Sequence, residues 1–301
     1  MKTNYTHQDM QCFLEKQMDI MPGCIEKLAE GETSQVVSFV RSDGQKLVLR
    51  IREHQKDLLA DKYAYRQFGG NLPIPEFLEV GQFASDTYYC ITVFANGVTA
   101  KSLSPDELAG VLPIIQDVLA KIYTMDVTST QGYGYIDTAT GNGPDPSWEL
   151  SLIRERNLLG LDELRQHAMT IGLPDSTIDR LNGQFEDNLP YVSQVRRLLH
   201  GDPGHDNLLI LEGKVSAVID WEQMAYGDWV RDFSRFGSGG HGDYGDINVF
   251  GIKYGLETDN ISERVAVYSA IRTMRDIEFA SSQKNEKVAT WIRNTIQKRM
   301  T

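Results

Sequence analysis

The sequence is poor in the features that mark secreted, zinc-binding or membrane-embedded proteins. Three cysteines occur in 301 residues, and no two of them form a C-x-x-C pair. This argues against a disulfide scaffold and against a zinc site, and it favours reduced thiols in a cytoplasm. No apolar run approaches the roughly 20 residues of a membrane-spanning helix, and residues 1–20 lack the uninterrupted apolar segment of a secretory signal. We therefore expect a cytoplasmic protein without a membrane partner.

Positive charge is also scarce, because 30 lysines and arginines stand against 42 aspartates and glutamates, for a net charge of −12. This balance argues against a nucleic-acid partner, which basic side chains would have to hold. Most of the acidic excess lies after residue 97. An acidic cleft there would attract a small cationic substrate, but from the charge alone solubility is the favoured explanation. The length suits one large domain or two smaller ones, and we expect a monomer.

The sequence does contain a dense group of phosphoryl-transfer residues in the segment 200–221, HGDPGHDNLLILEGKVSAVIDW. The spacing H-x-D-x-x-x-x-N, followed by an aspartate at the end of a predicted strand, is typical of kinase catalytic loops. The carboxylate of Asp202 would accept the proton of a substrate hydroxyl. The amide oxygen of Asn207 and the carboxylate of Asp220 are hard ligands of the kind that Mg²⁺ prefers.

The first part of the chain carries the pattern of a small sheet, with predicted strands at 24–28, 35–40, 46–52, 76–82 and 87–94. The turn at 31–34 contains only one glycine, and taken alone it is best explained as a surface hairpin; in a kinase it would cover the nucleotide phosphates, with hydroxyls such as that of Ser34 as donors. Arg50 lies in an otherwise apolar strand and needs an anionic partner. Asp61, on a predicted helix at 57–68, is the candidate. The alternative is an ordinary strand arginine and an exposed aspartate.

The pattern changes from strands to helices after Ala95-Asn96-Gly97. We predict an α+β fold of two lobes: a nucleotide-binding lobe at 1–94 with a five-stranded antiparallel sheet and a helix, a hinge at 95–97, and a larger, mainly helical lobe at 98–301. Beyond a first helix at 6–18, with Thr6 as its N-cap, further helices are predicted at 105–123, 147–170, 174–185, 229–236, 246–254, 262–279 and 284–299. The helix at 105–123 has a strong start, with Ser104 as N-cap, a proline next, and Glu107 three residues after the serine.

The path between Asp220 and the next predicted helix, which begins at Trp229, is short. A protein kinase has a long activation segment at this point, between its metal-binding aspartate and the region that docks the peptide. This chain has no room for such a segment. The predicted acceptor is therefore a small molecule.

These segments resemble the aminoglycoside phosphotransferase family, which has a protein-kinase-like fold. HGDPGHDN and VSAVIDWEQMAYGDWVRDF are similar to its motif block. More narrowly, LAEGETSQVVSF, KLVLRI, DKYAYRQF, LPIPEFLEVGQF, TYYCIT and NGVT look like the first lobe of the hygromycin B 4-O-phosphotransferases. The likeness is dense over 28–98 and 200–232, thins between them, and is poor from Gly237 onward.

The resemblance implies that Asp202 is the catalytic base and that Asn207 and Asp220 hold Mg²⁺. It places Arg50 where most of the family has lysine, a replacement shared with the hygromycin kinases, and it matches Asp61 to the family's acidic helix residue.

For the nucleotide, the resemblance implies that backbone groups around the hinge, at Val93 and Ala95, meet the purine of ATP or GTP. The loop departs from the commoner H-G-D-L-H-P-G-N at residues 203–206. Asp206 is either a substrate contact or a turn former. Glu222, Asp243 and Asp246 are further candidates for contacts to substrate ammonium groups.

Four other polar residues of this region are expected to have structural roles. His200 and His205 are predicted to be structural hydrogen-bonding groups. Asp228 and Asp232 are predicted to brace the loop and to cap the following helix.

The implied activity is transfer of the γ-phosphate of ATP or GTP to a hydroxyl of a polycationic aminocyclitol, with hygromycin B as the leading acceptor and resistance as the consequence. One alternative is a kinase for another hydroxylated metabolite or antibiotic, such as another aminoglycoside, a macrolide or a choline-like amine. A second is a non-catalytic ligand-binding protein on a kinase scaffold. The presence of Asp202, Asn207 and Asp220 together disfavours this second alternative.

Overall fold

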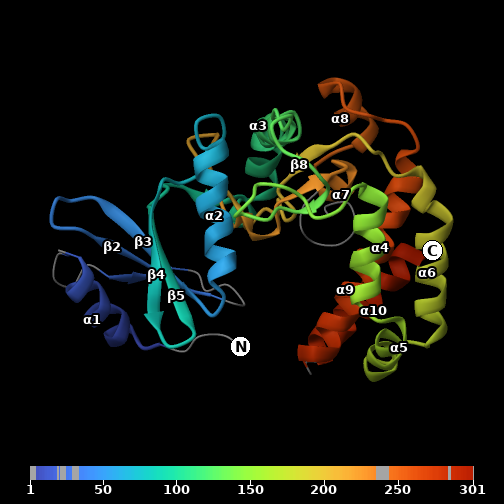
Figure 1. Ribbon diagram of the computed structural model, residues 1–301, viewed down its shortest axis with the longest axis horizontal. Coiled ribbons are helices and arrows are strands. Elements are labelled where there is room, and N and C mark those ends of the chain that lie inside the picture. Colours follow the sequence, from blue (N-terminus) through green and yellow to red (C-terminus); the bar gives the residue numbers. More distant parts are fainter. Residues whose placement is uncertain are drawn as a thin grey trace. The chain divides into compact units, whose positions relative to one another are not determined.

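The computed structural model of the chain describes residues 5–18, 20, 25–28, 34–234, 244–283 and 286–300, with only the backbone for 297–300. The chain forms two compact units, one of Met1–Val118 with Asp206–Gln223 and one of Leu119–His205 with Met224–Thr301 (Figure 1). These units do not coincide with the lobes predicted from the sequence. The boundaries at 94 and 98 stay a prediction.

The first unit contains the five-stranded sheet that the sequence predicts. Its order is β1-β2-β3-β5-β4, and all neighbouring strands are antiparallel. The strands are β1 (Glu26–Lys27), β2 (Gln35–Val40), β3 (Lys46–Arg52), β4 (Phe77–Ala84) and β5 (Thr87–Val93). The predicted strands at 35–40 and 46–52 have the observed bounds, whereas β1 is shorter than predicted.

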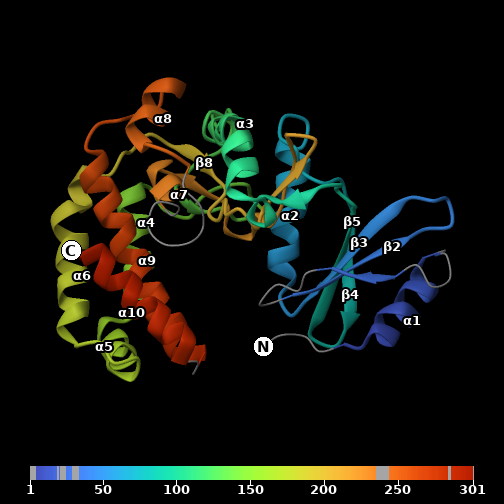
Figure 2. The same cartoon turned by 180° about the vertical axis from the view of Figure 1, so that it is seen from behind.

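Two helices cover opposite faces of this sheet, α1 (His7–Gln17) and α2 (Gln55–Phe68), as Figures 1 and 2 show. The period of two along β3 decides which side chain meets which helix. Leu47, Leu49 and Ile51 join the core beneath α1. Arg50 and Arg52, on the other face, therefore project toward α2.

Local hydrogen bonds fix the starts of two helices as the sequence predicts. Thr6 and Asp9 form a reciprocal capping box at α1. Ser104 and Glu107 do the same for α3 (Pro105–Tyr123), where the Ser104 N–H donates to the Glu107 carboxylate at 2.8 Å.

A second small sheet in the first unit has the order β10-β9-β6, formed by β6 (Val98–Thr99), β9 (Leu208–Leu211) and β10 (Lys214–Val218). The short 3₁₀ helices η1 (Ala100–Ser102) and η3 (Trp221–Gln223) complete the unit. Gly97 has φ +137°, and a Cβ there would lie 2.7 Å from the carbonyl oxygen of Ile210. This close approach lets β6, which the sequence pattern does not predict, pair with the β9–β10 hairpin.

The second unit is mainly helical. Its helices are α4 (Trp148–Leu158), α5 (Leu161–Thr170), α6 (Ser176–Asn188), α7 (Val230–Ser234), α8 (Ile247–Tyr254), α9 (Ile261–Gln283) and α10 (Glu286–Met300), with the 3₁₀ helix η2 (Leu189–Tyr191). A three-stranded sheet joins β7 (Gly134–Tyr135), β11 (Ala225–Gly227) and β8 (Arg197–Leu199) in the order β7-β11-β8. Apolar side chains of α5, α6, α9 and α10 form one core, and Figure 2 shows the ribbons of these four helices grouped together.

The prediction of a single helix over 147–170 is wrong. The segment forms two helices, α4 and α5, because Gly160 adopts the left-handed conformation with φ +63° and ends the first one. Among the described residues, no helix is long and apolar enough to cross a membrane.

Candidate active site

Asp220 follows the β9–β10 hairpin with an unusual backbone, φ +67°. This left-handed conformation costs a residue with a side chain about 1–3 kcal/mol unless its surroundings enforce it. On one side, the Ile219 N–H donates to the carbonyl oxygen of Asn207 at 3.0 Å. On the other, the Trp221 N–H donates to Asp61 Oδ1 at 2.9 Å. The hydrogen bonds flanking Asp220 hold its conformation and bring the backbone of Asn207 beside it.

Arg50 connects the two acidic residues of this site. Its Nη1 lies 2.7 Å from Asp61 Oδ2, so the ion pair predicted from the sequence is present. Its Nη2 lies 2.6 Å from Asp220 Oδ1, a contact that the sequence did not predict. The side chains of Arg50 and Asp61 are 14% exposed, whereas that of Asp220 is 34% exposed. The chain of charges thus runs from a buried end at Asp61 to an accessible end at Asp220.

Electrostatics keep this arginine charged. Burial opposes the charge, but the carboxylates of Asp220 and Asp61 raise the pKa of Arg50 above its ordinary value. Burial also raises the pKa of Asp61; Arg50 opposes that shift, and Asp220 adds to it. The carboxylate form of Asp61 therefore depends on Arg50.

Arg52 is a member of this cluster that the sequence reasoning missed. It lies two residues beyond Arg50 on the same face of β3, is 4% exposed, and forms an ion pair with Glu222. Asp57 Oδ2 is 3.8 Å from Arg52 Nη1, and Glu222 Oε2 is 3.9 Å from Arg50 Nη2. The signal was a second arginine at a spacing of two in an apolar strand. The substrate contact predicted for Glu222 stays a prediction, and the structure gives its carboxylate an arginine partner.

The charges of this cluster do not balance. Among the described residues, the ion pairs of this cluster join two guanidinium groups to four carboxylates, those of Asp57, Asp61, Asp220 and Glu222, an excess of two negative charges within these pairs. Such an excess suits a divalent cation, and Asp220 with Asn207 offers the oxygen donors that Mg²⁺ prefers. Within the described part of the chain there is no group of three or more His, Cys, Asp or Glu residues arranged to hold a metal. Nucleotide phosphates and water would therefore have to supply the other ligands, as is usual for Mg²⁺.

The loop that carries Asp202 belongs to the second unit and is held by buried groups. The Asp232 carboxylate accepts hydrogen bonds from the N–H groups of His200, at 2.8 Å, and Gly201, at 3.0 Å. The Asp202 N–H donates to His200 Nδ1 at 3.2 Å. The predicted structural roles of Asp232 and His200 are confirmed, and Asp202 itself stays partly exposed.

Two further contacts fix this loop. The Tyr244 hydroxyl donates to the carbonyl oxygen of Pro203 at 2.8 Å. The ring of buried His205 meets the Tyr244 ring edge-on, with centroids 4.9 Å apart. Asp228 caps α7 as predicted, by accepting from the Val230 N–H at 3.1 Å.

The residues predicted to contact the acceptor lie on exposed segments where they are described. Asp206 is exposed, with Lys101 Nζ 3.4 Å from its carboxylate. Asp246 caps α8 by accepting from the Val249 N–H at 2.9 Å. Asp243 lies outside the described residues. The substrate roles of all three stay predictions.

The predicted nucleotide contacts of the first unit lie at the ends of strands. Ser34 is buried directly before β2, and the turn residues 31–33 are outside the described part. Val93 ends β5, and its N–H donates to the carbonyl oxygen of Glu76 at 2.9 Å. Ala95 follows, half-buried. Their contacts to a nucleotide stay predictions.

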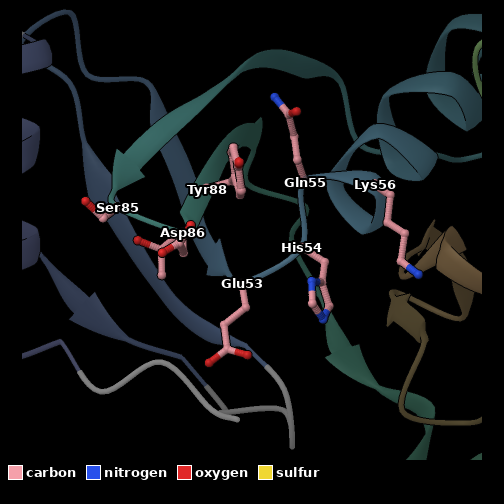
Figure 3. A pocket seen from close by; sticks show the side chains of 8 residues that line it. Glu53, His54, Gln55, Lys56, Ser85, Asp86 and Tyr88 are labelled. Carbon is pink, nitrogen blue, oxygen red and sulfur yellow. The ribbon is translucent and has the colours of Figure 1, made fainter.

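A surface pocket of about 610 Å³ lies elsewhere in the first unit (Figure 3). One wall is the segment after β3, and the other is the β4–β5 hairpin. Its lining residues are Glu53, His54, Gln55, Lys56, Ser85, Asp86, Thr87 and Tyr88. None of the predicted site residues lines it, so the cluster around Arg50 is a separate feature.

The chain is similar in sequence to a family of known proteins. The model of the phosphotransferase enzyme family matches residues 25–248. A curated relative, hygromycin-B 4-O-kinase of Escherichia coli, is 32% identical over 232 residues. This match covers 75% of the chain and 65% of the relative, so the chain spans just under two thirds of that protein's length.

Solved structures show the same fold. Aminoglycoside phosphotransferase APH(4)-Ia superposes with a TM-score of 0.83 over 97% of both chains, at 24% identity. A thermostable mutant of it, in ternary complex with AMP-PNP and hygromycin B, gives 0.76 over 95% of this chain and 96% of that one, also at 24% identity. The GDP complex of aminoglycoside 2'-phosphotransferase-IIIa gives 0.68 over 98% of both chains, at 15% identity. The predicted α+β, protein-kinase-like fold is confirmed.

Proposed function

The chain belongs to the phosphotransferase enzyme family, and we propose that it transfers the γ-phosphate of ATP or GTP to a hydroxyl of an aminocyclitol antibiotic. The observation that carries the chemistry is the charge chain Asp61–Arg50–Asp220. The acceptor, hygromycin B, rests on the name of the 32% identical relative. We place the enzyme in the cytoplasm as a monomer, with antibiotic resistance as its role.

Arg50 and Asp61 serve the nucleotide. A guanidinium that stays charged can steady nucleotide phosphates, and Asp61 fixes its direction with a 2.7 Å ion pair. Ser34 would add a hydroxyl donor, and the backbone at Val93 and Ala95 would meet the purine. Similar proteins bind AMP-PNP or GDP, so both ATP and GTP are donors to test.

Asn207 and Asp220 are the residues that would hold Mg²⁺. The excess of two negative charges around Arg50 and the partial exposure of Asp220 fit this assignment. A bound Mg²⁺ supplies charge neutralisation on the nucleotide phosphates. The chain's own part is to keep the Asp220 carboxylate in one place, which the hydrogen bonds of its neighbours Ile219 and Trp221 achieve.

Asp202 serves the acceptor. Its carboxylate orients the attacking hydroxyl and accepts its proton, while the His200 and Asp232 contacts keep the loop in place. Catalysis by such a set of groups is mainly positioning and charge stabilisation. Asp206, Asp243 and Asp246 are proposed to meet the acceptor's ammonium groups.

The direct test incubates the purified protein with MgATP or MgGTP and separate acceptors, and measures acceptor mass. The acceptors are hygromycin B, a second aminoglycoside, a macrolide and choline. We expect one phosphate on hygromycin B and none when Asp202→Asn replaces the wild type. Because Asn keeps the shape but cannot accept the proton, full turnover by this variant would contradict the mechanism.

The same panel separates the alternatives. Phosphate on another acceptor alone would make the protein a kinase of that molecule. Phosphate on none of them, together with nucleotide binding, would favour a non-catalytic ligand-binding protein. Nucleotide hydrolysis must be followed in parallel, since phosphate lost to water leaves acceptor mass unchanged.

A further inference from the structure

We infer that Arg52 and Glu222 form a clamp that positions Asp220 and thereby sets how strongly Mg²⁺ enhances nucleotide binding. This inference rests on the proposed function, because it concerns the metal-binding aspartate of that site. The sequence patterns did not predict a positioning role for Arg52 or for Glu222. Both are positioning residues, since they act through Asp220.

The strained backbone of Asp220 is the reason that a clamp is needed. A left-handed aspartate relaxes unless residues on both sides are held. Ile219 is tied to Asn207, and Trp221 is tied to Asp61. These hydrogen bonds fix the chain on either side of Asp220, and Glu222 adds a further attachment two residues after it.

Glu222 fixes the turn after Asp220. It lies in η3, and its carboxylate pairs with Arg52 on β3, the strand that also carries Arg50. The strand β3 thus holds Asp220 through Arg50, and it holds Glu222 through Arg52. Because β3 is a central strand of the sheet, both arginines have a rigid base.

Burial makes the clamp sensitive to the loss of either partner. Burial lowers the pKa of Arg52, and the neighbouring Arg50 lowers it further, so the guanidinium depends on nearby carboxylates. Glu222 is its ion-pair partner, and Asp57 is the more distant one, at 3.8 Å. Removing one member of a buried pair leaves the other without compensation. Without its partner, the side chain of Arg52 would move, and η3 would lose its attachment to β3.

Packing passes such a movement to Asp220. Trp221, between Asp220 and Glu222, is fully buried, and its Nε1 donates to the carbonyl oxygen of Val218 at 3.1 Å. Its ring lies 6.5 Å from that of Phe68 on α2. A turn packed this tightly moves as one body, so Glu222 controls the direction of the Asp220 carboxylate.

The test measures calorimetrically the affinity of the full chain for ADP with and without Mg²⁺. The ratio of the two affinities reports on Asp220, whereas the affinity without Mg²⁺ and the melting temperature report on the rest of the fold. For Glu222→Gln we expect the ratio to fall about tenfold, a size typical of coupled contacts, with little change in the affinity for ADP alone. Glu222→Asp, which keeps the carboxylate, should recover most of the ratio.

Three further variants complete the design. Arg52→Met removes the pair from the other side and is judged by the same ratio, also where Glu222→Gln does not fold. The double variant Arg52→Met/Glu222→Gln should be no worse than either single one, because each breaks the same clamp. Arg41→Met, which breaks the exposed pair with Asp43 in the same unit, is the matched control and should leave the ratio unchanged.

Three results would overturn the inference. A melting temperature that falls while the ratio stays at the wild-type value would make the pair structural only. A weakened acceptor affinity in Glu222→Gln, again with an unchanged ratio, would make Glu222 a substrate contact. If the wild-type protein bound ADP equally well with and without Mg²⁺, both the proposed function and the clamp would be overturned.

Discussion

Two buried arginine–carboxylate clusters, one in each unit, differ in a way that separates a brace from a binding site. In the second unit, Arg264 pairs with Asp228, and both are almost completely buried, at 1% and 0% exposed. In the first unit, Arg50 pairs with Asp61 and with Asp220, of which the latter is 34% exposed. In both clusters carboxylates raise the pKa of the arginine against the effect of burial.

The cluster in the second unit is closed. Asp228 accepts from Arg264, from the Val230 N–H at 3.1 Å and from the Tyr268 hydroxyl at 2.7 Å. The remaining nitrogen of Arg264, Nη1, donates to the carbonyl oxygens of Glu257 and Asp259. One positive charge meets one negative charge. Such a network holds elements together and has no capacity left for a ligand.

The cluster in the first unit differs in its charge balance and in its exposure to solvent, and we call it open. It has more carboxylates than guanidinium groups, a strained backbone at Asp220, and one carboxylate that solvent reaches. Structural clusters are expected to balance their charges, because a buried charge without a countercharge lowers the stability of the fold. An imbalance that ends at an accessible carboxylate therefore points to a cationic ligand. The next experiments test this contrast between the two clusters.

The largest effect is expected on breaking the closed cluster. Asp228→Asn leaves the buried Arg264 without a countercharge, which should cost about 3–5 kcal/mol of unfolding free energy. Urea denaturation measures this change. Asp43→Asn, in an exposed pair with Arg41, is the control and should leave the unfolding free energy unchanged. A small loss for Asp228→Asn would mean that the closed cluster is not a brace.

Breaking the open cluster should give the opposite pattern. Asp220→Asn removes one of the excess charges, and asparagine tolerates the left-handed backbone as well as aspartate does. We expect unfolding free energy near that of the wild type, with turnover reduced roughly 100- to 1000-fold because phosphate charge is no longer neutralised in place. Turnover with MgATP and urea denaturation on the same preparation decide this. A loss of stability equal to that of Asp228→Asn would abolish the distinction.

A smaller effect should follow from loosening Arg50 alone. Asp61→Asn removes the ion pair at 2.7 Å and keeps an oxygen acceptor for the Trp221 N–H. Arg50 then keeps Asp220 at 2.6 Å and the more distant Glu222 at 3.9 Å as its ion-pair partners. The KM for nucleotide should rise about tenfold, a typical size for a contact that orients a catalytic group, with a smaller change in kcat. An unchanged KM would remove Asp61 from the site.

The sequence predicts the open cluster only in part, and distance along the chain explains the limit. The alternation in β3 and the helical pattern around Asp61 place Arg50 and Asp61 on facing elements, only 11 residues apart. The pair of Arg52 and Glu222 joins residues 170 apart. Predicting it requires knowing that the chain after the β9–β10 hairpin returns beside β3, which no local pattern records.

The same limit applies to the elements themselves. Capping residues predicted the starts of α1 and α3, because caps act within one turn. The break at Gly160 was missed, since the helical pattern continues on both sides of it. The two-residue strand β6 was missed because it depends on a partner strand far along the chain.

The reactivity of Cys90 tests from which side solvent reaches the cluster around Arg50, and the expected effect is the smallest of the four. It lies opposite Arg50 in the β3–β5 pairing and is 1% exposed. Burial raises the pKa of its thiol to about 12, although Arg50 opposes the shift. At pH 8 the thiol is therefore neutral and shielded, whereas Cys12 is exposed. Iodoacetamide should label Cys12 but not Cys90 in the folded protein, and both after denaturation, as peptide masses would show. Labelling of Cys90 as fast as Cys12 would mean that solvent enters behind Arg50 as well as at Asp220.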